Sequence, residues 1–135
     1  VLNAKLPHLN EYITARQTAA AYYDQAFSTH PKIEIPACTK ASTHVYHQYT
    51  LRLHDVDRDA LRASLAEAGI PAMIYYPVPL HMQKAYQDAR YKAGDFPVAE
   101  RLAACVLSLP MHTELDEEQL AYICQHVIEG IDQQA

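Results

Sequence analysis

The residues best suited to chemistry in this chain lie in one stretch, Gly69 to Gln83, with the sequence GIPAMIYYPVPLHMQ. After a short apolar run it carries two phenols, Tyr75 and Tyr76, and one imidazole, His81. Two prolines spaced two apart forbid a helix and hold the backbone extended, outside any central sheet ladder. A stiff loop that presents polar tips indicates contact with a small ligand. A proline-rich turn with tyrosines packed beneath it would have the same composition.

Histidine is frequent enough to raise the question of a metal site, since the chain has eight. His44, His47 and His54 share one short segment. If that segment is a strand, His44 and His47 point to opposite faces and cannot share a tetrahedral ion without a bulge. No HExxH or related ligand spacing accompanies them. We therefore interpret the histidines as structural or surface residues and predict no metal site.

Nucleophilic catalysis has little support in the sequence. The cysteines are odd in number and show no CxxC spacing, which is typical of buried, reduced thiols in a cytosolic protein. With only three glycines, the chain has no phosphate-cradling loop, and it also lacks a nucleophile elbow. We predict that the chain carries no catalytic constellation of its own. The cysteines are Cys38, Cys105 and Cys124.

The first element that must position these residues is a long N-terminal helix. Apolar residues recur at threes and fours from Leu2 to Phe27 and form one stripe. Pro7 interrupts the pattern and predicts a kink or a first turn. The pattern begins without an N-cap, and the chain begins at Val1 rather than methionine. We therefore expect the helix to continue from an upstream segment and the chain to be a fragment.

The remaining pattern alternates short strands with helices. The helix after Asp57 has a capping residue, and Asp116 with Gln119 forms a capping-box pattern. The order α-β-β-α-β-α-β-α predicts one α/β (α+β) domain over residues 1–135, with a small mixed or antiparallel sheet and helices packed on one face. The expected strands are Ile33–Ile35, His44–Leu53, Ile70–Ile74 and Val106–Leu109, and the later helices are Arg58–Ala68, Pro97–Ala104 and the segment after Asp116.

Composition excludes several classes of protein. The chain of 135 residues is 50% hydrophobic, which suits one globular domain. Its formal net charge of -5 argues against nucleic-acid and anionic-membrane partners. No apolar run approaches the length of a membrane span, and no signal peptide opens the sequence. These features predict a cytoplasmic protein.

Three stretches resemble the C-terminal portion of the DegT/DnrJ/EryC1/StrS family of pyridoxal-phosphate-dependent sugar aminotransferases. The similarity covers nearly the whole chain, and the spacing between the stretches agrees with the family. The segment His44–Arg52 also falls where the family has a strand. The stretches are Val1–Leu9, then Gly69–Ile70 with Tyr75–His81, and finally Gly94–Glu100 running into Leu107–His112.

The resemblance implies the small C-terminal domain of a fold-type-I enzyme. The parent would transfer an amino group, usually from glutamate, to a nucleotide-linked keto-sugar in O-antigen or other surface-polysaccharide synthesis. Its partners would be its own large domain, the nucleotide sugar and a second copy in a homodimer. Tyr75 and Tyr76 match the His-Tyr pair that lines the nucleotide-sugar site in the family, and His81 follows in the same loop. Tyr75 stands where many members carry histidine, and a phenol supplies no positive charge at pH 7.

Other family features are missing. The cofactor-binding lysine, the aspartate that pairs with the pyridine nitrogen and most of the phosphate cup belong to the large domain. The resemblance therefore implies an isolated chain that binds no pyridoxal phosphate and is inactive. Two alternatives remain open, a stand-alone ligand-binding or regulatory module and an interaction domain whose apolar helix stripe binds a partner helix. The lysines present, none in the family's motif, are Lys5, Lys32, Lys40, Lys84 and Lys92.

Overall fold

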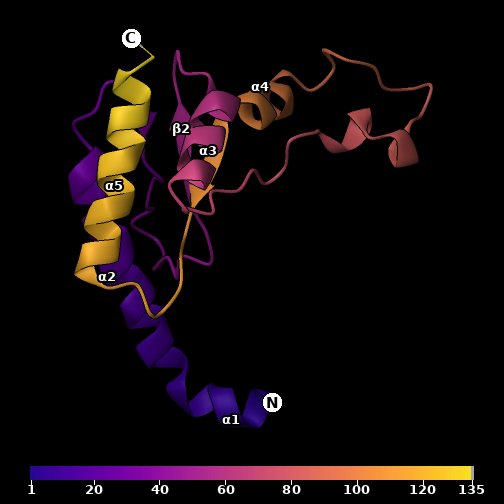
Figure 1. Ribbon diagram of the computed structural model, residues 1–135. Coiled ribbons are helices and arrows are strands. Elements are labelled where there is room, and N and C mark those ends of the chain that lie inside the picture. Colours follow the sequence, from indigo (N-terminus) through magenta and orange to yellow (C-terminus); the bar gives the residue numbers. More distant parts are fainter. Residues whose placement is uncertain (135) are drawn as a thin grey trace.

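The N-terminal helix is broken where its proline predicts a kink. The computed structural model describes residues 1–134. Its first helix, α1 (Leu2–Lys5), passes through the 3-10 turn η1 (Leu6–His8) into the long helix α2 (Leu9–Phe27) (Figure 1). Pro7 lies inside η1 and has no backbone N–H to donate, so the regular helix is interrupted there.

The apolar stripe of this helix is buried only in its second half. Tyr23 and Phe27 are fully buried in the core, whereas Leu2 and Leu6 are 82% and 67% exposed. Figure 1 shows α1 and the start of α2 projecting beyond the body of the molecule. The helix therefore has two parts, a core-forming C-terminal half and an apolar N-terminal half that faces solvent.

The sheet is antiparallel; the sequence predicted either a mixed or an antiparallel sheet. Its strands β1 (Ile33–Glu34), β2 (Tyr49–Leu53) and β3 (Val106–Leu109) lie in the order β1-β2-β3. In the register, Ile33 faces Leu53, Tyr49 faces Leu109 and Leu51 faces Leu107. All six of these side chains are buried. This apolar side of the sheet is therefore the one that the core covers.

Three helices join the sheet in one core. Helices α2 and α3 (Arg58–Glu67) both pack against α5 (Glu117–Asp132), which runs alongside α2 in Figure 1. The ring of Tyr23 on α2 lies 4.9 Å from the ring of Tyr49 on β2 and links the helices to the sheet. Helix α4 (Pro97–Cys105) leads directly into β3. The fold is the predicted small sheet with packed helices.

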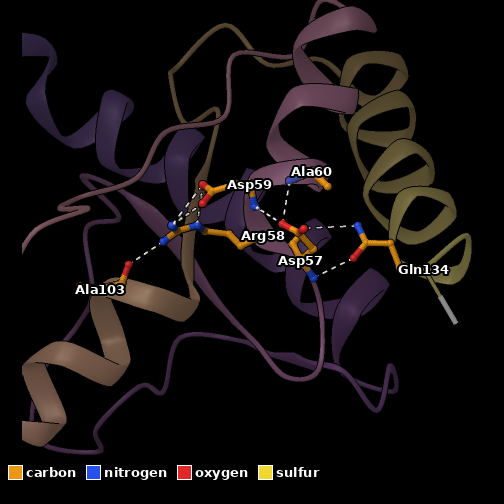
Figure 2. A network of polar contacts seen from close by, with 6 residues as sticks. All are labelled: Asp57, Arg58, Asp59, Ala60, Ala103 and Gln134. Carbon is orange, nitrogen blue, oxygen red and sulfur yellow. Dashed lines mark hydrogen bonds and ion pairs between the residues drawn. The ribbon is translucent and has the colours of Figure 1, made fainter.

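The turn before α3 connects the ends of three helices (Figure 2). The Asp57 carboxylate accepts hydrogen bonds from the N–H groups of Asp59 and Ala60, as expected of an N-cap. The Gln134 amide bonds both backbone groups of Asp57, and Arg58 donates to the Ala103 carbonyl of α4. These contacts set the position of α4, which forms one wall of the site described below.

The strand predicted over His44–Leu53 is wrong in its first half, because β2 begins only at Tyr49. Tyr46 adopts a left-handed backbone with φ of 48°, which is incompatible with a regular strand. The carbonyls of His44 and Val45 accept hydrogen bonds from Gln17 and Arg16 of α2. The side chains of α2 therefore satisfy this backbone in place of a neighbouring strand.

The strand predicted over Ile70–Ile74 is reduced to a single bridge. Met73 and Ser108 exchange both backbone hydrogen bonds, at 2.9 and 2.7 Å. Ile70 and Ile74 are buried, as the apolar run indicates. Pro71 has no N–H to extend the ladder at this end. The segment is an extended edge that delivers the following tyrosines out of the core.

The cysteines are free but not all buried, which corrects another prediction. Cys38 is exposed, Cys105 is half-buried and Cys124 is buried. Burial raises the pKa of the Cys124 thiol to about 12. Within residues 1–134, no helix is both long and apolar enough to cross a membrane.

Candidate functional site

Two of the three stretches that resemble the family, Tyr75–His81 and Gly94–Glu100, meet around one pocket. The segment after Tyr75 includes two 3-10 turns, η2 (Leu80–Met82) and η3 (Lys84–Tyr86), and projects from the body of the molecule before it returns at α4 (Figure 1). This segment and α4 enclose a pocket of about 480 Å³. Tyr75, Tyr76 and Tyr86 line it together with apolar residues of α4 and β3. We call it the tyrosine pocket.

The first two tyrosines of the pocket are open to ligand. Tyr75 is 39% exposed and Tyr76 is 72% exposed. Their rings meet edge to face, with centroids 5.8 Å apart and planes at 72°. A phenol group both donates and accepts hydrogen bonds. The structure therefore places the two predicted residues side by side at the same opening.

His81 is held differently from the tyrosines. Its side chain is only 8% exposed, and its Nε2 lies 3.0 Å from Oε1 of Glu100. Because an ionised carboxylate can only accept, the imidazole must donate this hydrogen bond. The ring also packs on Phe96, with centroids 4.8 Å apart. That His81 contacts a ligand remains a prediction, since one edge of its ring is already bound to Glu100.

The Glu100 carboxylate gathers three donors from two segments. Gly94 N lies 2.8 and 3.0 Å from its two oxygens, Phe96 N lies 3.3 Å from Oε1, and His81 donates as described above. These hydrogen bonds, above all that from Gly94, hold the pKa of Glu100 below its ordinary value. We call Glu100 with these three donors the Glu100 clamp.

Local sequence explains why the clamp forms. Pro97 occupies the first position of α4, and the N-cap residue Phe96 has no side chain able to cap. Glu100 reaches back from the first turn to the Phe96 N–H, in the manner of a capping box. Gly94 has φ of 93°, a left-handed conformation that glycine adopts without strain. The segment Gly94–Glu100 is therefore a helix start built around one carboxylate.

Two residues of this site, Glu100 and Tyr86, were not predicted from the sequence. Glu100 belongs to a quoted motif, and its place in the first turn after Phe96-Pro97 was an available sign of back-capping. Its contact with His81 spans 19 residues, and no local pattern predicts it. Tyr86 lies at the end of η3 and lines the tyrosine pocket, but no motif in the sequence marks it for that role.

The tyrosine pocket is mostly apolar, and its polar groups are uncharged. None of the described residues that line it is a lysine, arginine or histidine. The guanidinium of the nearby Arg90 donates hydrogen bonds to the Asp88 carboxylate, with nitrogen–oxygen distances of 3.0 and 2.7 Å. Phenols and an apolar floor suit the hydroxyls and ring faces of a neutral group better than a phosphate. The pocket can hydrogen-bond a polyol but offers no counter-charge.

The described residues do not fit a covalently bound pyridoxal phosphate. Such a site needs a lysine enclosed near groups that hold the phosphate and the ring. Lys32 is half-buried beside β1, and the other lysines are exposed. None of them lines the tyrosine pocket. Residues 1–134 also bring together no group of three or more His, Cys, Asp or Glu side chains that could hold a metal ion.

A second pocket, of about 380 Å³, lies between Gly69–Pro71 and the start of α5. Its lining includes Leu115, Tyr122 and Ile123. It contains none of the residues that the sequence marks for chemistry. A further pocket, of about 490 Å³, is lined by His81 and shares Leu80, Tyr86 and Ala99 with the tyrosine pocket. The tyrosine pocket is the candidate site because it brings Tyr75 and Tyr76 together.

Comparison with known proteins gives matches over most of the chain. The model of the DegT/DnrJ/EryC1/StrS aminotransferase family matches residues 1–128. A UDP-N-acetyl-3-dehydro-alpha-D-glucosamine 3-aminotransferase of Acidithiobacillus ferrooxidans is 42% identical over 91% of this chain and 32% of its own. A protein of Geobacillus stearothermophilus named pleiotropic regulatory protein is 40% identical over 96% of this chain and 35% of its own. The chain thus spans about a third of the length of these relatives.

Solved structures show the same fold. DesV of S. venezuelae, solved in complex with a ketimine intermediate, superposes with a TM-score of 0.89 at 34% identity. The match covers 96% of this chain and 34% of DesV. The aminotransferase TlmJ of Streptoalloteichus hindustanus gives a TM-score of 0.88 at 29% identity, over 98% of this chain and 35% of TlmJ.

Proposed function

The chain belongs to the DegT/DnrJ/EryC1/StrS aminotransferase family, and we propose that it is the C-terminal small domain of a sugar-nucleotide aminotransferase. The parent would transfer an amino group from glutamate to a nucleotide-linked keto-sugar. Relatives named as aminotransferases of UDP-linked sugars support this substrate class. Surface polysaccharide synthesis in the cytoplasm is the setting that we propose for the reaction.

The observation that carries this proposal is the tyrosine pocket itself. Two of the three stretches that resemble the family contribute to it, because the segment from Tyr75 to Leu80 supplies one wall and α4 supplies another. Its phenols can bond sugar hydroxyls, and its apolar floor can cover a ring face. A keto-sugar joined to a nucleotide offers both kinds of surface.

We assign Tyr75 and Tyr76 to direct contact with the nucleotide sugar. His81 does not line the tyrosine pocket itself but follows the lining residue Leu80, and its imidazole is anchored by Glu100. The negative charge of the diphosphate would be met by groups outside this chain, since the tyrosine pocket carries no cation. The contribution of this domain is therefore to bind and orient the substrate.

Pyridoxal phosphate, when bound, supplies the electron sink for amino transfer. We propose that a large domain holds it, because the lysines described above do not fit that role. On this proposal the isolated chain binds no cofactor and transfers no amino group. The exposed residues Leu2 and Leu6 would then pack against the large domain or a second copy.

The test is amino transfer by the full-length product of the gene that encodes this chain. Glutamate would be supplied with UDP-linked and dTDP-linked 3-keto-sugars, and the nucleotide amino-sugar measured by mass spectrometry. We expect product from the full-length protein and none from the isolated 135-residue chain. A full-length protein that binds pyridoxal phosphate but aminates neither sugar class would contradict the proposed substrate.

A regulatory or binding module is the second candidate. It is favoured by the name of the Geobacillus stearothermophilus relative, pleiotropic regulatory protein. On this alternative the full-length protein would bind a nucleotide sugar without turning it over. The same assay separates the two candidates when it is combined with a direct binding measurement.

A further inference from the structure

The Glu100 clamp joins both ends of the projecting segment to helix α4. We propose that Glu100 is a positioning residue that sets the place of Tyr75 and Tyr76 in the tyrosine pocket. This inference rests on the proposed function and deepens it, because it adds a residue that acts on the substrate site through His81. Glu100 itself contacts the loop rather than the ligand.

The first argument is connectivity. Between the Met73 bridge and the start of α4, the projecting segment has no strand pairing. His81 lies on its outgoing limb, whereas Gly94 lies on its returning limb. One carboxylate on α4 therefore ties both limbs to the body of the molecule. Without it, the outgoing limb that carries the tyrosines would lose its side-chain hydrogen bond to α4.

The second argument is burial. The side chains of His81 and Glu100 are only 8% and 25% exposed, so water cannot readily replace the hydrogen bond between them. An ionised carboxylate offers about four acceptor positions, and here it meets three donors. Glutamine would keep one acceptor oxygen and direct its NH₂ group toward donors. Substitution with glutamine should therefore loosen the clamp while preserving the volume of the side chain.

The third argument is adjacency to the pocket. Leu80 precedes His81 in the chain and Ala99 precedes Glu100, and both line the tyrosine pocket. Glu100 and His81 do not line it. The hydrogen bond between them thus joins two segments at positions next to residues that line the pocket. A shift of either residue would change the distance between those segments, and with it the fit of the sugar.

The experiment uses the full-length enzyme with its cofactor bound. Glu100→Gln and His81→Leu weaken the clamp, while His81→Gln is the conservative variant whose amide can still donate to Glu100. Glu67→Gln makes the same chemical change at the exposed end of α3 and is the matched control. The readouts are kcat and KM for the keto-sugar, KM for glutamate, cofactor content and amide exchange of residues 75–96.

We expect Glu100→Gln and His81→Leu to raise KM for the keto-sugar about tenfold, as for loss of a hydrogen bond to a charged group. The kcat, the KM for glutamate and the cofactor content should stay near those of the wild type. Amide exchange should accelerate around Tyr75 and Gly94. The KM of His81→Gln for the keto-sugar should stay close to that of the wild type. Glu67→Gln should change none of the readouts.

If KM rises equally for glutamate and for the keto-sugar, or if bound cofactor is lost, the Glu100 clamp has a merely structural role and the inference is overturned. If the wild type aminates no nucleotide sugar, the proposed function fails separately. Amide exchange then decides the inference alone. Unchanged exchange around Tyr75 in Glu100→Gln would contradict it, and faster exchange confined to residues 75–96 would support it.

Discussion

Single side chains divide the candidate site into residues that face solvent and residues that hold the loop. Tyr76 is open, whereas His81 is enclosed and bound to Glu100, although only four residues separate them in the sequence. Exposure makes Tyr76 available to a ligand, and enclosure gives His81 a fixed position. The two kinds of residue should respond differently to substitution.

Tyr76→Phe should weaken use of the sugar nucleotide by the full-length enzyme and leave cofactor content unchanged. Loss of one hydrogen bond costs about 0.5–1.5 kcal/mol, which is roughly a two- to twelvefold rise in KM for the sugar. Steady-state kinetics with varied sugar nucleotide measure this change. Tyr122→Phe is the matched control, since Tyr122 is an exposed tyrosine of α5 that lies outside the tyrosine pocket. A fall in cofactor content with Tyr76→Phe would mean a structural role instead.

The Glu100 clamp should depend on pH with a defined sign. The folded pKa of Glu100 lies below its ordinary value of 4.5, chiefly because of the Gly94 hydrogen bond. A carboxylate with a lowered folded pKa stabilises the fold above its unfolded pKa, and this contribution is lost as pH falls through the folded pKa. The Gly94 amide resonance should therefore shift with a midpoint below 4.5, as measured by two-dimensional NMR.

The control for this titration is Glu100→Gln, in which the pH-dependent shift of the Gly94 amide should disappear. A wild-type midpoint at or above the ordinary glutamate value would mean that the carboxylate is not held by these donors. A shift that persists in Glu100→Gln would assign the titration to another group.

At the residue scale, the sequence predicted the loop and its polar tips but not their partners. Two prolines and the phenols beside them are local features and could be identified directly. The contact between His81 and Glu100 depends on how the irregular segment between Met82 and Gly94 returns to α4. No periodicity marks that path, so the contact between His81 and Glu100 could be found only in three dimensions.

At the level of elements, helices α3 and α5 were predictable because the residues that precede them have side chains that cap a helix N-terminus. Asp57 and Asp116 cap α3 and α5 with the predicted hydrogen bonds. Strand lengths were less predictable, since alternation continues through His44–Gln48 although β2 begins at Tyr49. What ended the strand was competition from Arg16 and Gln17 on a distant helix. Local alternation contains no trace of that competition.

The contact between α3 and α5 leads to a stability prediction. A Cβ added at Gly130 would lie 2.6 Å from the Cδ1 of Leu61, which is fully buried. Alanine improves helix propensity by roughly 1 kcal/mol, but overpacking a core typically costs about 1–3 kcal/mol. We expect Gly130→Ala to lower the free energy of unfolding by about 1 kcal/mol. Urea denaturation measures this change.

The second half of that experiment combines Gly130→Ala with Leu61→Ala, which removes the clashing methyl group. If the clash is the cause, the double variant should be more stable than the sum of the two single changes predicts. Strict additivity, or a stabilising effect of Gly130→Ala alone, would show that Leu61 moves aside freely.

At the scale of the whole molecule, the apolar start of the chain is exposed to solvent. Leu2, Leu6 and Leu9 are exposed on α1, η1 and the first turn of α2, which project from the body of the molecule (Figure 1). Exposed apolar patches beyond a few hundred Å² are uncommon on monomers and tend to bind partners. On our proposal a large domain or a second copy covers these residues.

We therefore predict that the isolated chain self-associates, as a two-fold dimer through its first helix, because a two-fold contact uses the same patch twice. Sedimentation equilibrium measures this directly. Leu6→Glu combined with Ile13→Glu should shift the chain toward monomer. Ala63→Glu with Ala66→Glu adds the same charge on the exposed face of α3 and should leave association unchanged. A wild type that stays monomeric at high protein concentration would contradict the prediction.

The most direct test of the central proposal is the rate of amino transfer by the full-length protein with the tyrosine pocket intact and altered. Wild type and a Tyr75→Phe, Tyr76→Phe double variant would be compared with glutamate and a nucleotide-linked 3-keto-sugar. We predict transfer by the wild type and a loss of about tenfold or more in kcat/KM for the sugar in the double variant, at equal cofactor content. No transfer by the wild type, or equal transfer by both proteins, would contradict the assignment of this domain to sugar recognition.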